Sequence, residues 1–162
     1  RHLVNTFTLH TEELIPWACY DMSFELKRHF RLVSTEFQAG RKLMVFQWRL
    51  RKIYMWQFSL ADLALKGREP NVWAAEFLNS YQPIQGVIFS AGDKGTTDAT
   101  RGGPYRCGHY DEIGRMTFRY RVECRHVPET NSLRLMVFNY RRAGDLLELE
   151  GALNPAWLRN AA

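Results

Sequence analysis

Several features that mark large protein classes are scarce in this sequence. The 162 residues include only three cysteines (Cys19, Cys107 and Cys124), an odd number that is too small for a disulfide framework. Free thiols are typical of a reducing compartment, so an intracellular location is expected. The longest uninterrupted apolar runs have four to six residues, as in Leu14–Cys19, whereas a membrane-spanning helix needs roughly 20. The sequence therefore predicts neither a disulfide scaffold nor a membrane partner.

Lysine is also scarce, with 5 lysines against 17 arginines. Hydrophobic residues make up 46% of the chain and charged residues 24%, which is typical of a globular domain, and the net charge is +5. The guanidinium group binds phosphates in a bidentate way that an ammonium group does not match. The arginine excess therefore favours an anionic partner, nucleic acid above all, although a GC-rich genome would leave the same bias without any function.

The strongest secondary-structure signal is alternation between apolar and polar residues, which is typical of a half-buried strand. It runs almost perfectly from Arg115 to His126. One side carries the apolar residues Met116, Phe118, Tyr120, Val122 and Cys124. The other side carries Arg115, Thr117, Arg119, Arg121, Glu123 and Arg125. The pattern predicts a long strand with one buried face and one arginine-rich face.

Shorter patterns predict further elements. Val45–Leu60 alternates in the same way and is expected to form one strand or a bent pair of strands, and Leu133–Tyr140 forms another strand after a turn at 128–131. Weaker strand candidates are Leu3–Leu9, Tyr20–Leu26, Phe30–Phe37, Gly86–Ser90 and Leu146–Leu149. One helix is expected over Val72–Tyr81, with Asn71 as its N-cap.

These elements predict an all-β fold: an antiparallel β-sandwich, best matched by a single jelly roll, with one or two short helices. A closed barrel of the lipocalin type is the alternative, because a set of alternating strands with a short helix also suits it. Residues 1–162 are expected to form one domain, with 145–162 as a C-terminal tail. The aromatic residues expected in the core are Trp48, Trp56, Phe58, Phe118, Tyr120 and Phe138.

Catalytic and metal-binding motifs are weak. His109, close to Asp111, is the best candidate for a general acid or base, but no nucleophile or metal motif accompanies it. Cys107 with His109 and Cys124 with His126 form two Cys-x-His pairs, whose one-residue spacing is shorter than that of usual zinc sites. No enzymatic activity, cofactor or metal site is therefore expected, and zinc at these four residues is left open.

Basic residues gather into clusters with aromatic residues between them, a pattern typical of surfaces that bind nucleic acid. The predicted contacts are Arg119, Arg121 and Arg125 in one cluster, Arg49, Arg51 and Lys52 in a second, and Arg141 and Arg142 in a third. Lys27, Arg28 and Arg31 form a fourth basic cluster. The side chains of Arg119, Arg121 and Arg125 share one strand face, on which successive members of the cluster are expected to stand roughly 7 to 13 Å apart. This spacing suits backbone phosphates, but a solvated strand face gives the same pattern.

Three segments resemble the circovirus-like capsid proteins. Segment 48–58, with the sequence WRLRKIYMWQF, resembles their early core strand, in which an aromatic residue precedes an Arg-aliphatic-Arg-Lys run. Segment 16–24 is similar to the stretch before that strand, and Leu133–Arg141 resembles the closing strand. The resemblance implies a jelly roll that self-assembles into an icosahedral shell and packages a single-stranded genome. This sequence departs from that pattern at residues 1–15, ahead of segment 16–24, which contain one arginine where the family has an arginine-rich arm.

Composition, strand pattern and resemblance together predict a structural, coat-like subunit. Such a subunit associates with copies of itself and contacts the backbone of single-stranded nucleic acid, in a virion or inside a cell. Two alternatives from other classes stay open. One is a lipocalin-like barrel that binds a small apolar ligand, and the other is a small enzyme that uses His109.

Overall fold

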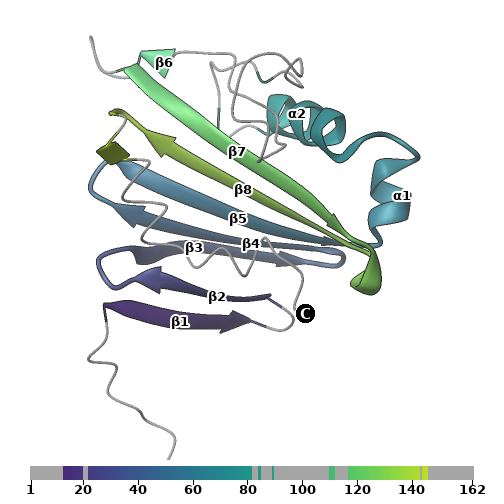
Figure 1. The fold of residues 1–162 in the computed structure, drawn as a ribbon, viewed down its shortest axis with the longest axis horizontal. Coiled ribbons are helices and arrows are strands. Elements are labelled where there is room, and N and C mark those ends of the chain that lie inside the picture. The colour runs from purple at the N-terminus through teal and green to yellow at the C-terminus, as the bar shows by residue number, and fades with distance from the viewer. Residues whose placement is uncertain are drawn as a thin grey trace, which may run out of the picture.

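The structure, a computed structural model, describes residues 13–19, 22–81, 84, 89, 110–111, 117–142 and 144–145. These ranges contain β1 (Leu14–Cys19), β2 (Met22–Lys27), β3 (Arg31–Gln38), β4 (Arg41–Trp48), β5 (Arg51–Ser59), α1 (Ala61–Leu65), α2 (Pro70–Ser80), β6 (Tyr110–Asp111), β7 (Thr117–Val127), the 3-10 turn η2 (Pro128–Thr130) and β8 (Ser132–Tyr140). The strands pair antiparallel. β1 and β2 form one sheet, and the large sheet has the order β3-β4-β5-β8-β7-β6 (Figure 1).

The large sheet is covered on both faces. On one face, α1 and α2 pack against alternate residues of the central strands around Trp56 and Leu135, which have no exposed surface. On the other face, the apolar side of β2 packs against the remaining residues of β4, β5 and β8, including Phe46 and Phe138. β5 is consequently buried on both sides, with six consecutive buried residues at 53–58. Burial of this apolar surface is the main stabilising contribution to the fold.

The β4–β5 hairpin turns at the two residues Arg49 and Leu50. Trp48 pairs with Arg51 across this turn, and the pairing continues without a register shift to Arg41 and Phe58. Of the two predictions for 45–60, one strand or a bent pair, the pair is therefore confirmed; its first strand begins at Arg41, four residues earlier than predicted.

The predicted helix at 72–81 is confirmed as α2, but the predicted N-cap is wrong. Glu69 occupies the N-cap position, and Asn71 lies inside the first turn. The helix begins earlier because Pro70 suits the first helical position: its ring fixes φ near the helical value, and an N–H there has no partner within the helix.

Most of the remaining predicted strands are confirmed. β3, β7 and β8 lie within two residues of their predicted bounds, β2 takes up most of Tyr20–Leu26, and the turn at 128–131 is η2 followed by Asn131 in a left-handed conformation (φ 44°). β1, β6 and α1 have no counterpart among the predicted ranges. The candidates Leu3–Leu9 and Leu146–Leu149 lie outside the described residues, as does 86–90 apart from Phe89.

The predicted fold class, an all-β antiparallel sandwich with short helices, is confirmed. The closed-barrel alternative is wrong, because β3 and β6 end the large sheet on opposite sides and do not pair within the described part of the chain. A jelly roll divides its strands between two sheets of similar size, whereas the described strands form sheets of two and six. The jelly roll therefore stays a prediction. Of the predicted tail 145–162, the structure describes Asp145 alone.

The predicted aromatic core is largely confirmed. Trp56, Phe58, Tyr120 and Phe138 are buried. Trp48 is only partly buried, because it is the last residue of β4 and its ring reaches the end of the sheet. The side chain of Phe118 lies outside the described residues.

The helix layer gives a direct test of the packing. Leu78→Ala, in α2, is expected to lower the free energy of unfolding by about 2–5 kcal/mol, because Leu78 has no exposed surface and its loss leaves a cavity against the sheet. Leu63→Ala, in α1, makes the same chemical change at a side chain that is 68% exposed, and we expect a change within about 0.5 kcal/mol. Urea unfolding measures both, and equal losses would contradict the described packing of α2.

Candidate nucleic-acid interface

The strand order gathers basic residues at one end of the large sheet. Neighbouring strands run in opposite directions, so the β2–β3 turn, the β4–β5 turn, the end of β8 and the start of β7 all lie at the same end, at the left of Figure 1. The register agrees, since Trp48 pairs with Arg51 and Lys52 pairs with Asn139. We call this region the basic end; its described residues are Arg28, Arg31, Arg49, Arg51, Lys52, Arg141 and Arg142.

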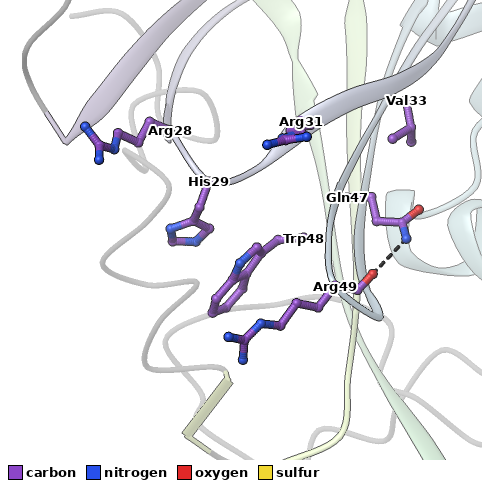
Figure 2. Close-up of a pocket in the computed structure, with 7 residues that line it drawn as sticks. All are labelled: Arg28, His29, Arg31, Val33, Gln47, Trp48 and Arg49. Carbon is purple, nitrogen blue, oxygen red and sulfur yellow. Dashed lines mark hydrogen bonds between the residues drawn. The ribbon is translucent and has the colours of Figure 1, made fainter.

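An open depression of about 700 Å³ lies at this end between the β2–β3 and β4–β5 turns. Its lining residues are Arg28, His29, Arg31, Val33, Gln47, Trp48 and Arg49 (Figure 2). The three arginines are exposed, and no ion pair to an acidic residue of the described chain holds them. One of them, Arg49, was a predicted contact, whereas Arg28 and Arg31 belong to the fourth cluster, outside the predicted site.

Trp48, which lines this depression, contacts a histidine ring and two arginines. The centroid of its ring lies 4.2 Å from that of His29. The guanidinium carbons of Arg51 and Arg49 lie 4.5 and 5.1 Å from the same ring, within cation–π range. Each such contact contributes about 0.5–2 kcal/mol and restricts the arginine side chain while leaving its N–H groups in the guanidinium plane for an anion. Trp48 therefore positions arginines.

Arg49 occupies a backbone position that arginine seldom adopts. It is the first residue of the two-residue turn and has φ 54°, in the left-handed region where Gly, Asn and Asp are favoured. The amide Nε2 of Gln47 donates a hydrogen bond to the Arg49 carbonyl at 2.7 Å and so holds the turn. The side chain of Arg49 points away from the strands, beside Trp48 (Figure 2).

Arg51 is committed to an internal contact. Its Nη2 donates a hydrogen bond to Oδ1 of Asp145, and the backbone N–H groups of Arg141 and Arg142 donate to Oδ2 at 3.0 Å each. Burial alone would raise the pKa of the Asp145 carboxyl, but these donors outweigh it and lower the pKa to about 2. Arg51 is thus neutralised, whereas Arg141 and Arg142 are fixed at the backbone and keep exposed side chains.

The predicted cluster on β7 (Arg119, Arg121 and Arg125) is divided between the two ends of the sheet. Arg121 lies near the basic end, but its side chain is 15% exposed and Nε donates to Oε1 of Glu123 at 3.2 Å. Arg125 pairs with Arg134 at the opposite end of the sheet, roughly 13 Å further along the strand. The backbone of Arg119 pairs with Tyr140 at the basic end, and its side chain lies outside the described residues.

Lys52, another predicted contact, is partly buried and contributes a backbone hydrogen bond between strands. Its side chain is partly buried, on the helix-covered face of the sheet with Tyr54 and Trp56. Its backbone N–H donates to Oδ1 of Asn139. The structure therefore uses this position to join β5 to β8 as well as to carry charge.

The residues of the metal and enzyme alternatives are only partly described. Cys107 and His109 lie outside the described residues. Burial raises the pKa of the Cys124 thiol to about 12, which disfavours the thiolate that zinc requires. Among the described residues, no group of three or more His, Cys, Asp or Glu side chains is arranged to hold a metal ion.

The Asp145 contacts predict a pH-dependent stability. Asp145→Asn is expected to lower the free energy of unfolding at pH 7 by about 2 kcal/mol, because a pKa lowered to about 2 stabilises the folded state by that amount when the carboxylate is charged. In the unsubstituted protein this contribution is complete above roughly pH 4 and is lost as the pH falls towards 2. Urea unfolding at several pH values measures both effects.

Asp62→Asn is the matched control, since Asp62 is an exposed carboxylate in α1 outside the described ion pairs. We expect Asp62→Asn to change the free energy of unfolding by less than about 0.5 kcal/mol at each pH value measured. Equal losses from Asp62→Asn and Asp145→Asn would show that the buried contact does not stabilise the fold.

The chain was also compared with known proteins. No protein family, curated protein or solved structure matches it. None of the helices in the described ranges has the length and apolar character needed to cross a membrane. The functional argument therefore rests on the geometry of the basic end.

Proposed function

We propose that this protein is a coat-like structural subunit that associates with copies of itself and binds the phosphate backbone of single-stranded nucleic acid at the basic end. One observation carries the proposal: five exposed arginines from three separate chain segments converge at one end of the large sheet, namely Arg28 and Arg31 at the β2–β3 turn, Arg49 in the β4–β5 turn, and Arg141 and Arg142 after β8. Released counterions would drive this binding, which makes it dependent on salt and independent of base sequence.

The depression favours a flexible single strand. It is open, and its lining combines the side chains of Arg28, Arg31 and Arg49 with the rings of His29 and Trp48 (Figure 2). Guanidinium groups beside aromatic surface are the usual combination in single-strand binding proteins, where cations track phosphates and rings contact bases. The cation–π contact with Trp48 holds Arg49 in place before the ligand arrives, which reduces the entropy lost on binding.

The coat-like part of the proposal has two supports. The resemblance of segments 16–24, 48–58 and 133–141 to circovirus-like capsid proteins implies self-assembly. In addition, β3 is an edge strand that exposes Leu32, Val33 and Phe37. The alternative of a ligand-binding barrel is not supported, because the described strands do not close into a barrel. The enzyme alternative depends on His109, outside the described residues.

Arg49→Gly tests the basic end without weakening the fold. Glycine adopts φ 54° without the roughly 1 kcal/mol penalty of a side chain, which offsets the lost cation–π contact with Trp48, so we expect the free energy of unfolding to change by less than about 1 kcal/mol. Affinity for single-stranded DNA is expected to fall several-fold at low salt. The slope of log Kd against log salt concentration is expected to fall by roughly 0.7 to 1, because one phosphate contact is lost. Fluorescence anisotropy with labelled oligonucleotides of unrelated sequence measures both.

Lys66→Gly is the matched control. Lys66 also has a left-handed conformation (φ 51°) and an exposed cationic side chain, but it ends α1, which follows the opposite end of β5. We expect this variant to keep the affinity and salt slope of the unsubstituted protein. Equal losses from the two variants would show that net charge, not the basic end, attracts the DNA. An affinity that depends on the oligonucleotide sequence would contradict backbone binding.

A further inference from the structure

The outer edge of β3 is the most exposed strand surface that the structure describes. β3 pairs with β4 on one side, and no described strand pairs with its other side. Seven of its eight residues are exposed, and Glu36 alone is partly buried. A strand of this length presents a row of backbone N–H and C=O groups that are ready to pair with another strand.

Apolar side chains accompany this edge. Val33 is 54% exposed, Phe37 49% and Leu32 37%. The register places Leu32 opposite Phe46 and Phe37 opposite Lys42, so these two side chains share the face on which the β1–β2 hairpin packs. Natural edge strands are usually protected by lysine, proline, inward-pointing charges or bulges; β3 contains no lysine or proline and has one bulge, at Val33.

We propose that β3 pairs antiparallel with β3 of a second copy of this chain, about a two-fold axis at Thr35. This interface deepens the self-association in the proposed function and rests on it. A two-fold axis across an antiparallel pair brings one residue opposite itself, which leaves three central choices in β3: Ser34, Thr35 and Glu36. An axis at Glu36 places two carboxylates opposite each other. An axis at Ser34 places Phe37 beyond the first residue of β3, because the bulge residues Leu32 and Val33 together oppose one residue.

The axis at Thr35 makes the strand complementary to itself. Thr35 lies opposite Thr35, a favourable cross-strand pair, and Ser34 lies opposite Glu36. Beyond them Phe37 of the second copy lies opposite Leu32 and Val33, because the bulge sets two residues against one. The exposed apolar side chains of each copy are thereby covered by those of the other.

Charge supports a second copy as the occupant. Glu36 keeps its ion pair with Arg41 at 2.7 Å, and Arg31 lies opposite an uncharged residue, Gln38. The two basic ends point in opposite directions along the joined strands, so the two Arg31 residues stand roughly 20 Å or more apart. This separation exceeds the screening length of about 8 Å at physiological salt, so the basic ends do not repel each other.

Cysteine cross-linking tests the register. Thr35→Cys is expected to give a disulfide-linked dimer, or one joined by a short thiol cross-linker, because the two side chains face each other at the axis. Gln38→Cys is the matched control: Gln38 is also exposed on the same strand, but its two copies stand roughly 20 Å apart in this register. The unsubstituted chain, with its native cysteines, gives the background. Equal cross-linking at both positions would overturn the proposed register.

Phe37→Glu tests the interface independently of cross-linking. The side chain is 49% exposed, so the fold is expected to survive, which circular dichroism checks. The negative charge opposite Leu32 and Val33 is expected to shift the protein to monomers in light scattering and to leave the salt slope of DNA binding unchanged. An oligomer that persists in this variant overturns the β3 interface and leaves the proposed function standing. An unsubstituted protein that stays monomeric but binds DNA overturns the self-association in both.

Discussion

Burial of the central strands on both faces is the constraint on which the rest of the structure depends. β4, β5 and β8 have no side that accepts water along their middle residues, so the sheet is stable only with the helices on one face and the β1–β2 hairpin on the other. Charged side chains are tolerated only where these strands end. The basic end is therefore a consequence of the packing: arginines occupy the turns because the strand interiors exclude them.

The sequence predicted most strands, because alternation survives in a single chain whatever its neighbours are. β7 and α2 follow from periodicity, β8 from an apolar segment after a turn, and β3 from its apolar residues. β1 was missed because Pro16 interrupts an apolar run without alternation. The division of β4 from β5 was left open, because Arg49 and Leu50 lack the glycine or asparagine that usually marks a two-residue turn. The choice between barrel and open sheet depended on edges, which no local pattern reveals.

The candidate site was predicted less completely, for a geometrical reason. Sequence clusters group neighbours in the chain, whereas the depression joins the β2–β3 turn to the β4–β5 turn, about 20 residues later. In a meander every second turn lies at the same end, so a turn predicted at 49–50 would have placed Arg28 and Arg31 near Arg49. No such rule predicts that Arg51 forms an ion pair with Asp145, 94 residues away. Opposite charges that meet at long range can be assigned only from the fold.

The pairing of β5 with β8 has a consequence for the order of folding. β3, β4 and β5 form a meander of local contacts, and β7 with β8 forms a local hairpin, but β5 and β8 are separated by 73 residues at Ser59–Ser132 and 87 at Lys52–Asn139. Such long-range pairing forms slowly, since the entropy of loop closure is lost before contacts compensate for it. On a ribosome, β5 emerges long before β8 is made. Until then its apolar edge stays open, so nascent chains are the species most in need of a chaperone.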